Sequence, residues 1–563
     1  MKKVIFVPPE IKNNQPTDLM ESYLQDILEE ALKTFDLDKS AWPKIQIEKP
    51  RDPSHGDAAT NLAMLLAKPL RNSPRKIAEE LSEKLKYDPD KISSVEIAGP
   101  GFINFRYANN YLFKALEEIL KKKTEYGKTD KYDDTNILIE FVSANPTGPL
   151  TVGHGRNAVL GDTIANMLEW TGAEVKREYY FNNAGRQMRV LGQSVQARYL
   201  QEMGKKSEFP EGGYEGEYIR EIAQRLVEEY GSDLAEQVDE KIFREKAEEE
   251  IFKEIGRTLK RMNIEMDSFF NEHTLYENKA IDKVIDTLRE KGLAFDQDGA
   301  VWFKTTEFGK DKDTVLVKST GEPTYRLPDI AYHADKLDRG YDLCIDVFGA
   351  DHIDTYPDVL NGIKALGYDD SKVDVLVYQF VTIVKEGKPF KMSTRKANFV
   401  TLDELMDEVG TDVTRFFFLM RSPSTHLEFD IAEAKEAGEK NPVFYLQYAH
   451  ARIQSILQKA EEISNFSGQP ELNLLTHDTE IRLIKDLLEF PGIIYSAADT
   501  REPHRLIHYL NGLASDFTSF YHECRILGED EKLMEARTAL ATATAQTLAN
   551  GLEILGISAP DHM

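Results

Sequence analysis

Ala144-Asn-Pro-Thr-Gly-Pro-Leu-Thr-Val-Gly-His154 is a polar stretch with two glycines and two prolines, and it continues into Gly155-Arg156. It follows an apolar run, residues 137–142, and precedes residues 157–170, where apolar side chains recur at helical spacing. A loop of this kind between a buried strand and a helix is typical of a nucleotide cradle, because the helix directs its positive N-terminal end at phosphate. The pattern predicts a strand, a nucleotide-binding loop and a helix in direct succession.

Further strands and helices are expected on the C-terminal side of this unit. Residues 173–181 have the pattern of a second strand, so we expect a βαβ unit and hence a parallel sheet covered by helices. Residues from about 187 to 288 are charged and helix-periodic, which indicates a helical insertion with a solvated surface. Strand-like patterns return at 300–305, 314–318, 343–348 and 373–384. Beyond about residue 411 we expect no further strand, because long amphipathic helices follow.

The N-terminal region has the pattern of a separate module. It opens with a helical pattern at 19–35 and closes with an alternating stretch, 94–106, around a Gly-Pro-Gly turn. The predicted fold class is therefore an α/β Rossmann-like catalytic domain with an N-terminal α+β module and a C-terminal all-α helical bundle. The predicted boundaries are 1–110 for the module, 111–135 for a linker, 136–410 for the catalytic domain and 411–563 for the bundle.

The composition limits the class of protein. The formal net charge is 70 − 97 = −27, which argues against non-specific coating of nucleic acid, although local basic patches stay open. Cys344 and Cys524 are the two cysteines, too far apart in sequence to indicate a disulfide framework or a thiolate zinc site. The N-terminal apolar run is too short for a secretory signal, and no stretch has the apolar length of a membrane span. We expect a cytoplasmic protein without a membrane partner.

A second segment suited to phosphate, Lys391-Met-Ser-Thr-Arg395, follows residues 385–390, which have the pattern of a hairpin and turn. A cationic loop there suits nucleotidyl transfer, because such catalysis mostly neutralises charge as diphosphate leaves. Taken alone, a run of this kind is as often solvated surface. In the first segment, Gly153 lets a base or phosphate approach the backbone, and His154 offers an N–H group to developing charge. Together the two segments indicate ATP-dependent chemistry at one site built from two halves of the fold.

These segments carry a resemblance to a known family. The first resembles the HIGH motif of the class I aminoacyl-tRNA synthetases, and the second resembles their KMSKS loop. Within that class the chain resembles the arginyl-tRNA synthetases over nearly its whole length. Residues 55–63 and 98–105 are similar to their additional N-terminal domain, and residues 441–452 and 547–560 to their helical anticodon-binding domain. The resemblance implies an arginine–tRNA ligase that activates L-arginine with ATP to arginyl-adenylate and transfers it to the 3′-terminal ribose of tRNA(Arg).

The resemblance also assigns residues to roles. The implied catalytic residues are His154, Lys391, Ser393 and Arg395. The implied ATP-binding residues are Pro146, Gly148, Thr151, Gly153, His154, Gly349, Asp351, Lys391 and Met392. The implied arginine-binding residues are Glu140, Ser143, Asn145, Tyr325, Asp329 and His352. The implied tRNA contacts are Asn61, Phe102, Tyr448, Arg452 and Met563. ATP is expected as its Mg²⁺ complex, with no tightly bound cofactor, no metal held by the protein, and a monomeric chain.

The implied arginine pocket agrees with the chemistry of a guanidinium. Tyr325 and Asp329 are four positions apart at the start of an expected helix, so both can face one pocket. A guanidinium prefers planar, bidentate carboxylate partners, and Glu140 with Asp329 would leave a carboxylate poorly paired with any other amino acid. Without the resemblance, Asp329 is most simply a helix-start residue favoured by the helix dipole.

The chain departs from the family pattern in two places. Thr151 stands at the first histidine of HIGH, and Thr394 at the second lysine of KMSK. The position before HIGH that holds a lysine in some relatives is Gly148 here, so Arg395 or Lys396 is expected to substitute, and the sequence does not decide which. Two alternatives stay open: another class I synthetase with a different amino acid, and a catalytically silent tRNA-binding protein on a synthetase scaffold.

Overall fold

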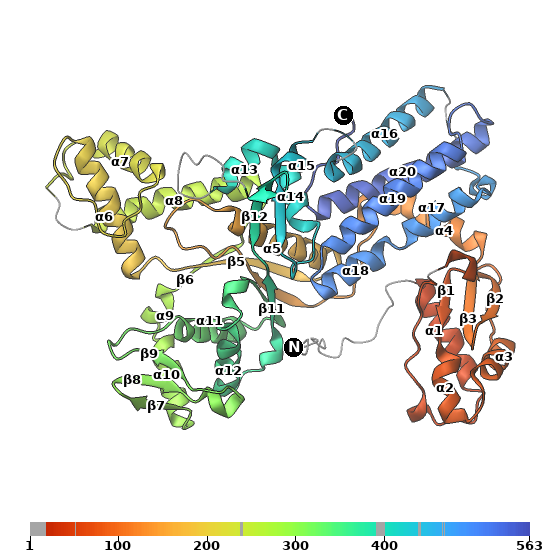
Figure 1. The fold of residues 1–563 in the computed structure, drawn as a ribbon. Helices are drawn as coiled ribbons and strands as arrows, with labels where there is room; N and C mark the ends of the chain where they lie inside the picture. Colours follow the sequence, from red (N-terminus) through yellow and green to blue (C-terminus); the bar gives the residue numbers. More distant parts are fainter. Residues whose placement is uncertain are drawn as a thin grey trace.

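The computed structural model describes residues 19–50, 52–236, 240–389, 400–436, 438, 441–463, 466 and 468–563. Figure 1 shows a long molecule with a central parallel sheet, a helical bundle on one side and the N-terminal module beneath the far end of the bundle. Within the described part of the chain, no helix is long and apolar enough to cross a membrane.

A five-stranded parallel sheet forms the centre of the fold, in the order β11-β10-β4-β5-β6. The chain runs outward from β4 through β5 to β6, then returns to the other side of β4 for β10 and β11. The order therefore reverses between β4 and β10, which is where open α/β sheets bind ligands. The strands are β4 (Asn136–Glu140), β5 (Glu174–Phe181), β6 (Ser268–Asn271), β10 (Leu343–Gly349) and β11 (Val373–Tyr378). This topology confirms the predicted Rossmann-like domain.

Helix α5 (Val152–Trp170) follows β4 and is largely buried, as the strand–loop–helix prediction requires. Its first turn is capped by Thr151, whose hydroxyl accepts the backbone N–H of His154. A side chain at Gly161 would place its Cβ 2.3 Å from Cγ of Phe141, so glycine is what lets α5 approach the end of β4 so closely. The helix thus carries the polar loop to the point where the strand order reverses.

The region predicted as a helical insertion contains both helices and a strand of the central sheet. Helices α6 (Gly185–Glu202), α7 (Glu217–Tyr230) and α8 (Lys241–Arg261) pack together at one end of the molecule (Figure 1). They are followed by β6, then by α9 (His273–Glu277) and α10 (Ala280–Glu290). The later runs at 300–305 and 314–318 do not extend the central sheet. They form a separate antiparallel sheet from β7 (Ala294–Gln297), β8 (Ala300–Phe303) and β9 (Thr314–Val317).

Two expectations for the next part of the chain were wrong. The apolar run 373–384 is not one strand, because it divides into β11 and β12 (Val381–Lys385), which belong to different sheets. A strand also occurs beyond residue 411, since β14 (Leu427–Asp430) pairs in parallel with β12. The predicted hairpin is confirmed, as β12 pairs antiparallel with β13 (Lys388–Pro389). The helices of this part are α11 (Arg326–Asp338), α12 (Tyr356–Leu366), α13 (Leu402–Val409), α14 (Thr411–Leu419) and α15 (Ile431–Lys435).

The C-terminal bundle shares its hydrophobic core with the catalytic domain, since one continuous cluster runs from Leu112 to Ile557. Arg415 of α14 lies at the junction and is fully buried. Its guanidinium donates to Asp162 Oδ2 of α5 (2.6 Å) and to the carbonyl oxygens of Met262 (2.6 Å) and Leu555 (2.8 Å). The bundle helices are α16 (Pro442–Ile463), α17 (Asp478–Leu488), α18 (Phe490–Thr500), α19 (His504–Glu523) and α20 (Glu531–Ile554).

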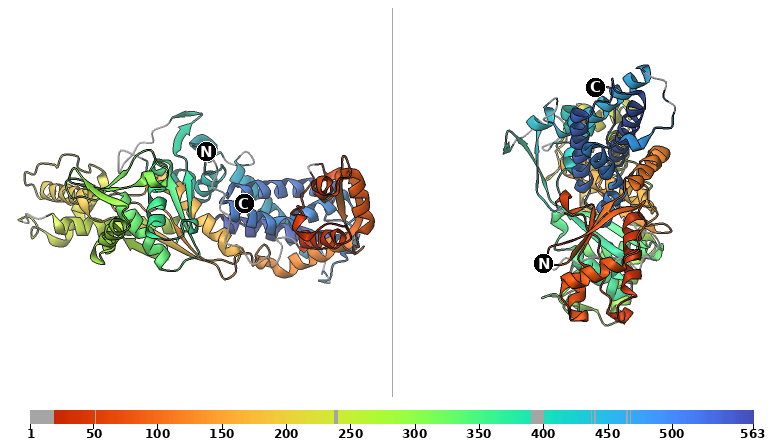
Figure 2. Two further views of the ribbon diagram at one scale, coloured as in Figure 1. Left: turned by 90° about the horizontal axis from the view of Figure 1, so that it is seen from below. Right: turned by 90° about the vertical axis from the view of Figure 1, so that its right-hand side faces the viewer.

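The N-terminal module has a hydrophobic core of its own, formed between Met20 and Phe105. Its elements are α1 (Leu19–Leu32), β1 (Ala58–Thr60), α2 (Leu62–Leu70), α3 (Pro74–Lys84), β2 (Ile92–Ala98) and β3 (Phe102–Tyr107). Helix α4 (Asn109–Lys122) then spans much of the predicted linker and packs on α17 and α20. The module lies beside the bundle in all three views (Figures 1 and 2), and Lys485 of α17 pairs with Asp57 at 2.6 Å.

Candidate active site

The candidate site lies where the strand order reverses, at the carboxyl ends of β4 and β10 and the N-terminus of α5. Residues 141–145 form a sharp turn after β4, and η5 (Ala350–His352) follows β10. In the turn, Val142 and Ser143 have φ angles of 66° and 43°. A β-branched residue rarely adopts such a conformation, and strain of this kind persists only where the surroundings hold it.

Side chains and backbone groups of β5 hold the turn from one side. The Tyr179 hydroxyl donates to the carbonyl oxygen of Ala144 (2.7 Å), and the Tyr180 N–H donates to Ser143 Oγ (3.2 Å). The Asn182 N–H, just beyond β5, donates to Asn145 Oδ1 (3.1 Å). Ser143 and Asn145, two of the implied arginine-binding residues, are therefore fixed in orientation at the crevice.

The cap of helix α5 determines which ring nitrogen of His154 carries the proton. Its Nδ1 accepts the backbone N–H of Thr151 (3.1 Å), which completes a capping box with a histidine in the usual place of Glu or Gln. Nδ1 therefore carries a lone pair and the proton of the neutral ring sits on Nε2. Burial lowers the pKa of His154 below its ordinary value, which favours this neutral form. The ring can donate one N–H bond from Nε2 without carrying a charge.

The two glycines of the loop, Gly148 and Gly153, have different structural explanations. Among the described residues, a Cβ at Gly153 would meet only Thr151 Oγ1, at 3.7 Å, so their packing does not demand glycine there. Open space beside that backbone fits the expectation that a ligand approaches it. A Cβ at Gly148 would lie 3.1 Å from the Tyr218 hydroxyl, which itself donates to the carbonyl oxygen of Thr147 (2.8 Å). Packing against the inserted helix α7 therefore explains glycine at 148.

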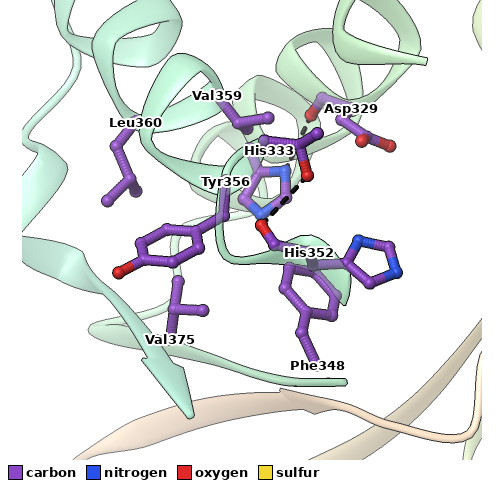
Figure 3. Close-up of a pocket in the computed structure, with 9 residues that line it drawn as sticks. Asp329, His333, Phe348, His352, Tyr356, Val359, Leu360 and Val375 are labelled. Carbon is purple, nitrogen blue, oxygen red and sulfur yellow. Dashed lines mark hydrogen bonds between the residues drawn. The ribbon is translucent and has the colours of Figure 1, made fainter. Parts of the chain in front are cut away.

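A small pocket beside the crevice contains Asp329 and His352 (Figure 3). Asp329 is on the first turn of α11, and burial raises the pKa of its carboxyl to about 7, with the nearby negative charges of Glu140 and Glu272 adding to the effect. The His352 ring stacks on Phe348, with ring centroids 5.0 Å apart. The remaining lining residues are His333, Thr355, Tyr356, Val359, Leu360 and Val375.

The sequence predicted that Glu140 and Asp329 would both offer a carboxylate to the ligand. This expectation was wrong for Glu140, because its carboxylate is already paired within the protein. Its carboxylate is buried, with Oε2 2.5 Å from Lys336 Nζ and Oε1 accepting the Ser143 hydroxyl (2.9 Å). Lys336 also pairs with Asp346 Oδ1 at 2.5 Å, and Asp346 Oδ2 lies 2.7 Å from His333 Nε2. Burial raises the pKa of Glu140, while Lys336 opposes that shift. Asp329 is thus the acidic residue of the pocket lining, whereas Glu140 is paired with an internal cation.

The structure does not bring Tyr325 together with Asp329 in the pocket. The Tyr325 side chain is 82% exposed and is absent from the pocket lining, although both residues are at the start of α11. Helical spacing was the basis of that expectation. Tyr325 is the N-cap residue of α11, and its side chain extends into solvent instead of joining Asp329.

The cationic loop residues Lys391, Met392, Ser393 and Arg395 lie outside the described residues, as do Thr394 and Lys396. The chain on either side of them is fixed to the segment that carries His154. After the loop, the Leu402 N–H donates to the carbonyl oxygen of Leu150 (2.8 Å). Before it, buried Arg156 donates to the carbonyl oxygen of Gln379 (2.5 Å). The same guanidinium also donates to the carbonyl oxygens of Thr425 (3.1 Å) and Ser422 (3.2 Å), which follow the loop.

The residues implied in tRNA contact lie on two parts of the molecule. Asn61 and Phe102 are on the N-terminal module, and Phe102 is 37% exposed. Tyr448 and Arg452 are on α16, and the Arg452 guanidinium lies 4.9 Å from the centre of the Tyr521 ring. Met563 is at the exposed C-terminus.

Sequence reasoning missed Lys336, Asp346, His333 and Arg156 as parts of the site. A signal existed for two of them, because Asp329, His333 and Lys336 recur at i, i+4 and i+7 on one helix face. Asp346 stands inside an apolar strand, which is an unusual place for an acid without a partner. Within the described part of the chain, no group of three or more His, Cys, Asp or Glu side chains could hold a metal ion.

Three family models match the chain in succession. The arginyl tRNA synthetase N terminal domain matches residues 22–107, and the catalytic domain of tRNA synthetases class I (R) matches residues 115–417. The DALR anticodon binding domain matches residues 446–563. Together they cover the N-terminal module, the site described above and most of the bundle.

Curated relatives and solved structures agree with those models. The arginine–tRNA ligase of Salinibacter ruber is 55% identical over 92% of this chain and 96% of its own, and that of Desulfotalea psychrophila is 48% identical over 97% and 100%. A putative arginyl-tRNA synthetase structure from Campylobacter jejuni matches 80% of this chain and 99% of its own, with 31% identity and a TM-score of 0.75. The Thermus thermophilus arginyl-tRNA synthetase, at 24% identity and a TM-score of 0.76, covers 97% of this chain and 100% of its own and shows the same fold.

Proposed function

The chain belongs to the arginine–tRNA ligases among the class I aminoacyl-tRNA synthetases, and on this premise we propose how its residues carry out the reaction. The enzyme activates L-arginine with ATP to arginyl-adenylate and diphosphate, then transfers the arginyl group to the 3′-terminal ribose of tRNA(Arg) and releases AMP. The 55% identity to an arginine–tRNA ligase over nearly the full length carries this conclusion and leaves no support for the two alternatives.

Activation is an in-line attack of the arginine carboxylate on the α-phosphate of ATP, which enters as its Mg²⁺ complex. No protein nucleophile is needed, so positioning and neutralisation of charge supply the catalysis. We assign the Nε2–H of His154 as a donor to the phosphate oxygen that gains charge, supported by the tautomer that the Thr151 cap imposes. Lys391, Ser393 and Arg395 are proposed as the groups that neutralise the leaving diphosphate.

The ATP site is proposed to lie along the loop and the N-terminus of α5. The open space beside Gly153 supports close approach of the nucleotide to the backbone. Thr151 acts there through the helix cap, and Gly148 through its packing against Tyr218. Further proposed contacts, carried over from the family, are Pro146, Gly349, Asp351 and Met392.

Arginine is proposed to bind with its guanidinium at Asp329. The support is the position of this carboxyl in the pocket and the pairing of Glu140 with Lys336, which leaves one acid to face the ligand. Ser143 and Asn145 are proposed to hold the amino and carboxylate groups at the crevice. Tyr325 and His352 remain proposed contacts, and exposed Tyr325 would have to turn toward the pocket.

The modules outside the catalytic domain are proposed to bind tRNA. The proposed boundaries are 1–110, 111–135, 136–410 with an insertion at about 187–288, and 411–563. The support for three domains is the succession of three family models, of which the catalytic one begins at residue 115, within the proposed linker. Proposed contacts are Asn61, Phe102, Tyr448, Arg452 and Met563. A monomer is proposed because one chain carries the site and both modules proposed to bind tRNA. A cytoplasmic location is proposed as carried over from the family.

The test is ATP-dependent attachment of labelled arginine to total tRNA, run beside lysine, glutamine and cysteine. Arginine alone should be attached, and His154→Ala should lower kcat by about 100-fold, the usual effect of losing one donor to developing charge. His508→Ala is the matched control, because this histidine is exposed on α19. Attachment of a different amino acid would refute the arginine pocket, and equal activity of both variants would refute the role of His154.

A further inference from the structure

Asn157 joins the two strand ends between which the strand order reverses. It is on α5, about one turn beyond His154, and is 6% exposed. Its Oδ1 accepts the backbone N–H of Val142 after β4 (2.5 Å), and its Nδ2 donates to the carbonyl oxygen of Val347 in β10 (2.7 Å). One partner is a donor and the other an acceptor, so the orientation of the amide is determined.

The bond to Val142 holds the strained part of the turn. Val142 is 5% exposed and has a φ of 66°, a conformation that costs free energy for a β-branched side chain. Its N–H would otherwise be buried without an acceptor, which proteins avoid. Asn157 therefore compensates for a conformation that the chain would not adopt by itself.

The turn presents the groups proposed to bind the amino acid. Ser143 and Asn145 are tied to β5 on one side, through Tyr180 and Asn182. Asn157 fixes the other side of the turn by accepting a hydrogen bond from the Val142 N–H. Without it, the Val142 N–H loses its acceptor and the strained backbone can relax, which would weaken the bonds that hold the Ser143 hydroxyl and the Asn145 amide at the crevice.

We propose that Asn157 is a positioning residue for arginine: it spans the ends of β4 and β10 and fixes the strained turn that presents Ser143 and Asn145. This inference rests on the proposed binding of the amino acid at that turn. It predicts a selective effect on arginine, whereas a residue that only stabilises α5 would affect all substrates alike.

Asn166 offers a matched control on the same helix. Its Nδ2 also donates to a carbonyl oxygen, that of Ile554 (3.0 Å), and its Oδ1 also accepts a bond, from Arg177 (2.7 Å). These contacts lead to the bundle and to β5 rather than to the strained turn. Asn166→Ala thus removes similar bonds from the same helix without touching residues 141–145.

The experiment measures KM for arginine and for ATP in tRNA charging, with the melting temperature, for wild type, Asn157→Ala and Asn166→Ala. Asn157→Ala should raise KM for arginine by at least about tenfold, the effect of one buried group losing its partner, and KM for ATP by less than about twofold. Asn166→Ala should lower the melting temperature without changing either KM. If Asn157→Ala does not fold, Asn157→Leu decides, because it keeps a similar size and loses the acceptor of the Val142 N–H.

An unchanged KM for arginine, equal rises for both substrates, or the same rise in Asn166→Ala would overturn the inference. Ser143→Ala separates it from the proposed site. If Ser143→Ala raises KM for arginine and Asn157→Ala does not, only the inference fails. If Ser143→Ala has no effect, both fail, and a wild type that attaches no arginine refutes the function itself.

Discussion

Asp329 should make arginine binding depend on pH near neutrality. Burial raises the pKa of its carboxyl to about 7, and Glu140 and Glu272 add to the shift while His333 and Lys336 oppose it. A guanidinium stays charged throughout this range and pairs with the ionised carboxylate. Arginine therefore has to bind the deprotonated form of the pocket, and protonation competes with it.

The size of the effect follows from the pKa. Competition by one proton multiplies the apparent Kd for arginine by 1 + 10^(pKa − pH), which is about 11 at pH 6, about 2 at pH 7 and about 1.1 at pH 8. At pH 7, about half a proton should leave the protein for each arginine bound, since about half of the carboxyls are still protonated.

Isothermal titration of arginine at pH 6, 7 and 8, in two buffers with different ionisation enthalpies, measures both quantities. Asp329→Asn should bind arginine more weakly and lose the pH dependence. A Kd in wild type that stays constant between pH 6 and pH 8 would refute the reasoning. A slope that persists in Asp329→Asn would assign the titration to a group other than Asp329.

The same shift has a consequence for stability. The folded carboxyl has a higher pKa than the unfolded one, so the folded state binds more protons between about pH 4 and pH 7. This residue therefore lowers the free energy of unfolding as pH rises through that window. Asp329→Asn should be more stable than wild type at pH 8 but not at pH 4, as measured by calorimetry.

Three further predictions concern residues that join parts of the fold. Arg415→Ala should lower the free energy of unfolding of the shared core by about 3–5 kcal/mol, because it removes the closer of the two cations paired with buried Asp162; calorimetry with exposed Arg505→Ala as control should show the difference. Arg156→Lys should lower kcat by about tenfold in tRNA charging, since an ammonium has all its donors on one nitrogen and cannot match the two nitrogens from which the planar guanidinium reaches these carbonyl oxygens; an unchanged kcat would show that this bridge does not position the catalytic loop. Lys485→Ala should raise KM for tRNA and leave KM for arginine unchanged, because its pair with Asp57 joins the N-terminal module to the bundle; equal KM values for tRNA would contradict this.

The sequence best predicted those parts of the fold whose residues are contiguous in the chain. The strand before residue 142, the loop to His154 and helix α5 follow each other directly, so apolar spacing and glycines suffice to define them. The hairpin of β12 and β13 is equally local. The pairing of β14 with β12 spans more than 40 residues, and no local pattern could assign it.

The same limit applies to the candidate site. Glu140 and Lys336 are 196 positions apart, so the pairing that leaves Asp329 as the open acid appears only after folding. The tautomer of His154 could be inferred only from the cap geometry, since a histidine at the third helical position is not a usual partner in a capping box. Tyr325 shows the reverse case, in which correct spacing did not place a side chain in the pocket.

The continuous core shared by the catalytic domain and the bundle bears on how such chains evolve. Buried Arg415 contacts α5, the end of α8 and the end of α20 at once, so exchange of the bundle, which supplies the Leu555 carbonyl oxygen, would disturb the contacts of a buried guanidinium. The N-terminal module, with its own core, meets the bundle through ion pairs such as Lys485 with Asp57. Recombination could therefore add or replace the first module as a unit, whereas the catalytic domain and the bundle must be inherited together.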